Sequence, residues 1–212
     1  LSGSGTYGTV NSMKNVTMSG GTTATTIQSN ETVTLSNSSV SNVSSIGNVY
    51  VTGGGTQITT INTMGSVVAT GGSITNTNAN GAVTVVNGNN STINAIGNVT
   101  VVQGSFLTIN TNGTYKGTNG PSLKTLNAIG GINQTNGSIA SSKTQGNQWQ
   151  SGTSTTYGLV QGNLTEDQWG SFDGLAGGTI TKSQQWNMNV KGTVQPGLQV
   201  TITPVTALSI PP

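Results

Sequence analysis

Acidic side chains are the groups in this chain best able to do chemistry, and there are only four of them. Glu166, Asp167 and Asp173 lie close together around Trp169, whereas Glu31 stands far away. Most glycosidases need two carboxylates that face one bond, but neighbours such as Glu166 and Asp167 point to opposite faces of a strand. The cluster could bind a sugar or calcium; a solvated loop around a packed tryptophan is the simpler interpretation.

Other catalytic groups are scarce. The chain contains no histidine and no cysteine, which excludes imidazole bases, thiol nucleophiles and zinc sites built from these residues. Ser142 and Lys143 form a Ser-Lys pair, but serine is too frequent in this sequence for one pair to be informative. We therefore expect no enzyme activity, no cofactor and no metal.

The charge of the chain limits its partners. Only 5% of the residues are charged, against about 25% in a typical domain. There is no arginine and the lysines are dispersed, so we expect no nucleic-acid binding. No stretch of 18 apolar residues predicts a membrane span. A surface of Thr, Asn, Ser and Gly depends little on titration, which favours a secreted protein, extracellular or on a cell surface.

A repeat of about 16 residues organises the sequence. The triplet at 47–49 recurs at 65–67, 81–83 and 97–99, and its traces continue to Gly178. Two apolar columns spaced two residues apart predict a strand with one buried face. Two more columns, spaced three apart, predict a bent second strand. Glycines between the strands are expected to turn the chain with positive φ. They are Gly54, Gly72, Gly88 and Gly104.

Asparagines recur at the same period after the second strand. They are Asn62, Asn78, Asn94, Asn110 and Asn127. In stacked parallel coils such side chains lie above one another, so their carboxamides can join into a ladder. No single coil can bury its own apolar face, so the coils must stack. The predicted fold is all-β, a parallel β-solenoid (β-helix) with about 16 residues per coil.

The repeat loses regularity towards its end, which divides the chain into a regular solenoid at 1–140 and an irregular β-rich part at 141–212. Gln148 and Gln150 enter the apolar columns there. This part is either a degenerate continuation of the solenoid or a separate cap. Alternation over 198–202 predicts a C-terminal strand, which either caps the last coil or is donated to the next subunit.

Two segments carry a resemblance to known families. GNVTVVQGSFLTI at 97–109 and GNVYVTGGGTQI at 47–58 resemble repeats of filamentous-haemagglutinin-type bacterial adhesins. The resemblance covers roughly residues 15–140 and implies a right-handed parallel β-helix displayed on a cell surface. QGNQWQ at 145–150 is more weakly similar to curlin-type fibre subunits, which also stack coils rich in Gly, Asn and Gln.

We expect the chain to be a structural subunit of an extracellular filament or surface fibre, with copies of itself as partners. Strand pairing or solenoid stacking would join the copies. The alternative is a monomeric adhesin that binds surface glycans through tryptophans in the irregular part. These are Trp149, Trp169 and Trp186. A column of outward threonines, Thr17, Thr34, Thr84 and Thr100, leaves ice binding as a weaker alternative.

Glycosylation is possible at several Asn-x-Ser/Thr sequons if the host modifies asparagine. Candidate positions are Asn15, Asn30, Asn98, Asn112 and Asn163.

Overall fold

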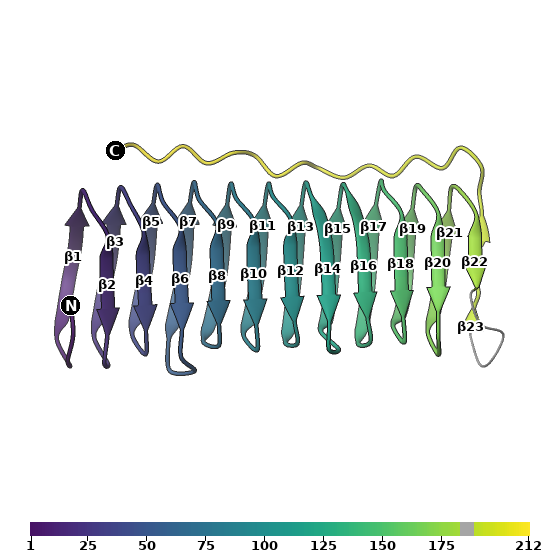
Figure 1. Cartoon of the computed structure of the whole chain (residues 1–212). Helices are drawn as coiled ribbons and strands as arrows, with labels where there is room; N and C mark the ends of the chain where they lie inside the picture. The colour runs from purple at the N-terminus through teal and green to yellow at the C-terminus, as the bar shows by residue number, and fades with distance from the viewer. Residues whose placement is uncertain (183–188) are drawn as a thin grey trace. The chain divides into compact units, whose positions relative to one another are not determined.

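The computed structural model describes residues 1–182 and 189–212, so Trp186 lies outside the described residues. Within them the regular structure is all strand, and parallel strands stack about 16 residues apart. The predicted all-β parallel solenoid is confirmed. The chain divides into two compact units, Leu1–Gly97 with Thr206–Pro212, and Asn98–Val205. In each unit, a coil adds one strand to an odd-numbered sheet and one to an even-numbered sheet (Figure 1).

The first unit begins with an end strand of each sheet. Its odd sheet pairs β1 (Thr6–Ser12), β3 (Thr23–Ser29), β5 (Ser39–Ser45), β7 (Gln57–Thr63), β9 (Ser73–Ala79) and β11 (Asn89–Ala95) in that order. Its even sheet pairs β2 (Val16–Ser19), β4 (Val33–Ser36), β6 (Val49–Thr52), β8 (Val67–Thr70) and β10 (Val83–Val86).

The second unit repeats this arrangement. Its odd sheet pairs β13 (Ser105–Thr111), β15 (Ser122–Ala128), β17 (Ser138–Thr144), β19 (Ser154–Val160) and β21 (Ser171–Ala176), and β21 pairs with both β23 (Asn189–Val190) and β24 (Thr193–Val194). Its even sheet pairs β12 (Val99–Val102), β14 (Thr114–Thr118), β16 (Gly131–Thr135), β18 (Gln148–Ser151), β20 (Leu164–Asp167) and β22 (Ile180–Lys182). Strand β17 contains residue 140, so the coils continue across the predicted domain boundary.

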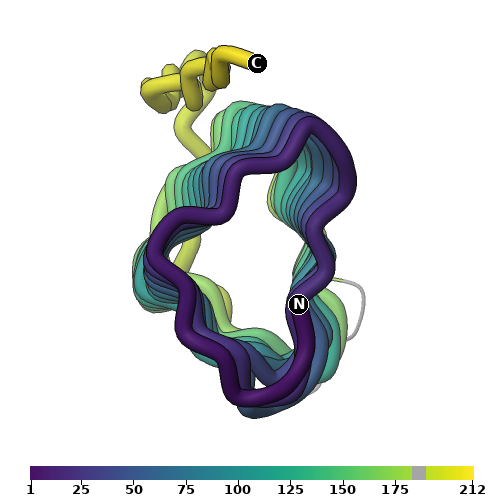
Figure 2. Tube along the Cα trace, turned by 90° about the vertical axis from the view of Figure 1, so that its left-hand side faces the viewer, coloured from purple at the N-terminus to yellow at the C-terminus, as the bar shows by residue number. Residues whose placement is uncertain are grey.

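The core of each unit consists of the predicted columns. Viewed along the coils, equivalent positions of the first unit superpose (Figure 2). In the even strands, alternate residues point inward and stack in register, as Val33 does on Val49. In β7, Ile58, Ile61 and Thr63 are buried. The two residues after Ile58 both face outward, which explains the spacing of three as a bend in the strand. The column of small residues at the Thr63 position was not predicted.

The turn after each even strand holds a residue with positive φ. These residues are Gly20, Asn37, Gly53, Gly71 and Asn87 in the first unit, and Gln103, Asn119, Asn136, Gly152 and Gln168 in the second. Of the predicted turn glycines, Gly72 and Gly104 have positive φ, but the prediction was wrong for Gly54 and Gly88. Asparagine also tolerates the left-handed region, so the recurring position need not contain glycine and was misplaced by one residue.

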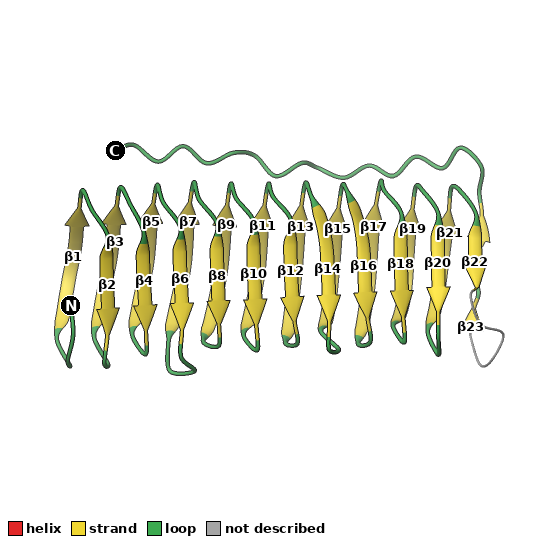
Figure 3. Ribbon diagram, viewed as in Figure 1, coloured by secondary structure: helices red, strands yellow, loops and turns green. Residues whose placement is uncertain are grey.

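The predicted C-terminal strand is absent. From Gln195 to Pro212 the chain has no strand (Figure 3). Proline at 204, 211 and 212 lacks the N–H that a strand ladder requires, so alternation over 198–202 was misleading. Residues 198–212, here called the tail, lie instead along the turns that follow the odd strands, 198–205 on the second unit and 206–212 on the first (Figure 1).

Candidate functional site

The tail is bound by one column of side chains, which we call the hook row. It consists of the residue that directly follows each odd strand. In the first unit these are Met13, Asn30, Ile46, Met64, Asn80 and Ile96. In the second unit they are Asn112, Ile129, Gln145, Gln161 and Gly177. Because the coils are stacked, the row places one side chain per coil along the same edge of each unit.

In the second unit, amide side chains of the hook row bind the main chain of the tail. Asn112 donates from Nδ2 to the Val205 carbonyl oxygen at 2.9 Å, and its Oδ1 accepts the Val205 N–H at 2.7 Å. Gln145 donates to the Val200 carbonyl oxygen at 3.0 Å. Gln161 accepts the Val200 N–H at 3.2 Å. A carboxamide has both a donor and an acceptor, so it can satisfy a whole peptide group that has no strand partner.

In the first unit, Asn80 binds Leu208 in the same way. Its Nδ2 lies 2.8 Å from the Leu208 carbonyl oxygen, and its Oδ1 lies 2.7 Å from the Leu208 nitrogen. Ile202 and Val205 in the second unit and Leu208 in the first are all at least partly buried. Their spacing of three is the period of a polyproline II helix, which has no internal hydrogen bonds. The tail therefore offers its peptide groups to the hooks and its apolar side chains to the coils.

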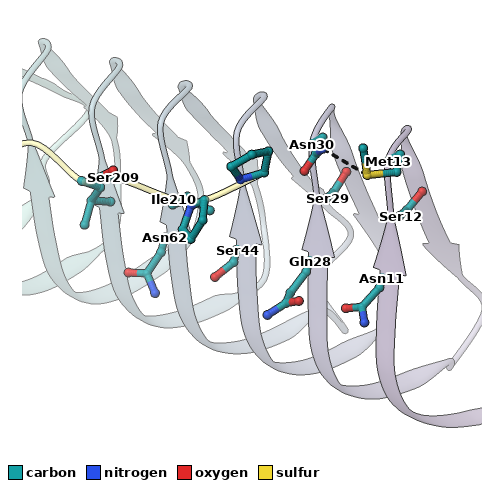
Figure 4. A pocket seen from close by; sticks show the side chains of 13 residues that line it. Asn11, Ser12, Met13, Gln28, Ser29, Asn30, Ser44, Asn62, Ser209 and Ile210 are labelled. Carbon is teal, nitrogen blue, oxygen red and sulfur yellow. Dashed lines mark hydrogen bonds between the residues drawn. The ribbon is translucent and has the colours of Figure 1, made fainter.

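A groove of about 610 Å³ lies in the first unit beside the end of the tail (Figure 4). Leu208–Pro212 form one side of it, and Met13 and Asn30 of the hook row lie at its other end. Here the Asn30 amide nitrogen is 3.3 Å from the sulfur of Met13, a side chain that is 73% exposed. The groove thus contains a carboxamide of the hook row that donates to a thioether where Asn80 binds the tail.

The asparagines of the predicted ladder are hydrogen-bonded to one another. Asn78 donates to Asn62 at 2.8 Å, and Asn94 donates to Asn78 at 2.9 Å. In the second unit Asn127 donates to Asn110 at 2.9 Å. These side chains are half-buried, and Asn62 lines the groove near the tail. The ladder runs next to the hook row and stabilises the wall of the groove.

Three of the sequon asparagines connect adjacent coils. The side-chain oxygens of Asn15, Asn98 and Asn163 each accept, at 2.9 Å, the N–H of the equivalent residue in the next coil. All three are exposed. The other two belong to the hook row, because Asn112 binds Val205 and Asn30 lies in the groove. Sequence reasoning found these asparagines for a different reason and missed both structural roles.

The tryptophans and acids do not form one site. Trp149 is half-buried on β18, whereas Trp169 is 70% exposed in the turn after β20, with a φ of 43°. Glu166 points into the coil and is fully buried, while Asp173 is exposed on the odd sheet. The pattern of the repeat already carried this signal, because Glu166 lies 16 residues after Gln150 in an inward column.

Glu166 ends a buried chain of polar side chains. Gln148 donates to Gln150 at 2.8 Å, Thr155 donates to Gln150 at 2.8 Å, and Gln150 donates to the Glu166 carboxyl. Burial raises the pKa of Glu166 to about 8; the hydrogen bond from Gln150 opposes the shift and the Asp167 charge adds to it. The carboxyl is therefore mostly neutral at pH 7, which lowers the cost of burying it.

No protein-family model, curated protein or solved structure matches this chain. Over residues 1–182 and 189–212, there is no helix long and apolar enough to cross a membrane. In the same residues, His, Cys, Asp and Glu form no cluster of three that could hold a metal ion. The tail, the hook row and the open ends of the coils are thus the features from which a function can be inferred.

Proposed function

We propose that this protein is a structural subunit of an extracellular filament or surface fibre, whose copies join by strand pairing at open coil ends. The observation that carries the proposal is the exposed core beneath β1. Tyr7 and Val10 on β1 point inward but are only half-buried. Their register partners on β3, Ala24 and Ile27, are 6% and 0% exposed. A further coil stacked on β1 would bury the same positions.

The edge of the first unit also offers backbone groups for pairing. β1 is the end strand of its sheet, and it contains neither a charged residue nor a proline. Natural proteins commonly use such residues to prevent edge-to-edge association. On the even sheet, Leu1 starts another coil: its ammonium group donates to Thr17 at 2.6 Å and its carbonyl accepts from Ser19 at 3.0 Å.

The last strands of the second unit leave a second edge. β23 and β24 have two residues each, and Val194 on β24 is 45% exposed. Pairing of this edge with β1 of another copy would join two different surfaces. Contacts of this kind do not close on themselves unless the rotation returns to the start, so they generate filaments.

Electron microscopy at increasing protein concentration tests the proposal. We expect fibres from the wild-type chain, and short particles from Val10→Lys, which places a charge in the open core. Thr25→Lys adds the same charge on an exposed outward position of β3 and should still form fibres. Monodisperse particles of the wild-type chain at high concentration, or fibres from Val10→Lys, would overturn the proposal.

A second candidate function, binding of surface glycans, is favoured by Trp169 alone. An aromatic side chain that is 70% exposed on a positive-φ turn is costly to keep there without a role. Tryptophan fluorescence during titration with host glycans measures such binding. Quenching that disappears in Trp169→Phe would support it, and an unchanged response in that variant would exclude Trp169 as the contact.

A further inference from the structure

We propose that the groove around Asn30 and Met13 binds a proline-containing segment of a partner protein in an extended, polyproline II conformation. This site is distinct from the coil ends that the filament proposal uses. The occupant is inferred from the tail, which shows what the same row of side chains binds.

The open part of the hook row is continuous with the occupied part. Asn30 follows β3 just as Asn80 follows β9, and both main-chain nitrogens make the same coil-to-coil bond, at 3.1 Å to Ser12 and 3.0 Å to Thr63. The two carboxamides therefore start from equivalent backbone positions on the first unit. Asn80 uses its side chain to bind Leu208, whereas Asn30 faces the groove (Figure 4).

The contact that Asn30 makes now is a weak one. A thioether sulfur is a poor acceptor compared with a peptide carbonyl. Met13 is flexible and 73% exposed, so it can move aside and cover an apolar side chain of the ligand. Replacing the sulfur by a peptide carbonyl and adding a peptide N–H on Oδ1 would reproduce the pair of bonds that Asn80 makes to Leu208.

The lining of the groove sets the chemistry of the ligand. Asn11, Gln28 and Ser44 form one wall, and no charged side chain lines the groove. An acidic or basic peptide would find no partner there, so the ligand is uncharged. A polyproline II segment fits because its peptide groups are not paired internally and its stiffness reduces the entropy lost on binding.

The test uses the full chain and a labelled synthetic peptide with the sequence of Thr201–Pro212. Fluorescence anisotropy should show saturable binding, weakened at least tenfold by Asn30→Leu and by Met13→Glu, an exposed position where folding is unaffected. Asn42→Leu, an exposed asparagine outside the row, is the matched control and should bind like wild type. A peptide with glycine in place of its three prolines should bind at least fivefold more weakly.

Several outcomes would overturn the proposal. Absence of saturable binding at millimolar peptide is one, and equal affinity of wild type and both groove variants is another. Binding seen only in Leu208→Pro, which removes the N–H bound by Asn80 and frees the tail, would mean that the row has room for one tail and no partner. Self-association lost in Asn30→Leu would identify the occupant as a second copy instead of a partner protein.

Discussion

Asn112 holds the peptide group of Val205 by two hydrogen bonds, as donor at 2.9 Å and as acceptor at 2.7 Å. This pairing lets a segment without strand partners lie ordered against a solenoid. Asn80 repeats the arrangement with Leu208 in the first unit. The coil repeat supplies the hooks at fixed intervals, so a tail with any side chains compatible with the surface can be bound through its main chain.

Asn112→Asp should release the tail without unfolding the coils. A carboxylate can accept the Val205 N–H but cannot donate to its carbonyl, and the loss of one such bond costs about 1 kcal/mol. Limited proteolysis with thermolysin, followed by mass spectrometry, should show cleavage within the tail about fivefold faster than in wild type. Asn42→Asp is the control. Equal cleavage rates in all three proteins would show that Asn112 does not hold the tail.

Asn78 is the central rung of the ladder in the first unit, since it donates to Asn62 and accepts from Asn94. Asn78→Leu removes both bonds and should lower the free energy of unfolding by about 2 kcal/mol. Urea denaturation followed by circular dichroism measures this. Asn42→Leu, with one exposed amide removed, should change it by less than about 0.5 kcal/mol, and a similar loss in both variants would contradict the ladder.

Gly97 allows adjacent coils to approach closely. A Cβ at this position would lie 2.8 Å from the Ala82 nitrogen and 2.9 Å from the Gly81 oxygen. Gly97→Ala should therefore destabilise the protein by about 2 kcal/mol or more, because main-chain atoms must move. Gly54 has open space around it and no positive φ, so Gly54→Ala should be neutral or stabilise by about 0.5 kcal/mol. Thermal unfolding of the two variants compares them directly.

The stability of the protein should fall as pH rises from about 4.5 to about 8. Burial raises the pKa of Glu166 from 4.5 to about 8, so in this range the folded state binds more protons than the unfolded state. The stabilisation is complete below the unfolded pKa and is lost as pH rises through the folded pKa. Urea midpoints at pH 5 and pH 8.5 should differ in wild type, by on the order of 2 kcal/mol.

Glu166→Gln should remove most of that difference, because the amide stays neutral and can still bond with Gln150. The variant should therefore be more stable than wild type at pH 8.5. An equal pH dependence in both proteins would show that another group titrates on unfolding. Asp173→Gln, at an exposed acid, is the matched control and should keep the wild-type dependence.

The sequence alone was sufficient to predict the coil and its period. Coils stack on their nearest neighbours, so a contact in space is also a fixed step of about 16 residues along the chain. For this reason the columns containing Val49 and Ile61 and the hydrogen-bonded rung of Asn78 are visible as repeats of residue type along the chain. The inward position of Glu166 follows from the same step, although the tryptophan beside it suggested a loop.

Only the tertiary structure decided where the tail lies and what it binds. Asn80 and Leu208 are 128 residues apart, and no repeat relates a hook to the peptide group that it binds. The prolines excluded a strand over the last residues, but they did not indicate a bound polyproline II segment. Main-chain recognition by a carboxamide depends on position and not on the identity of the bound residue, so it leaves no pattern in the bound sequence.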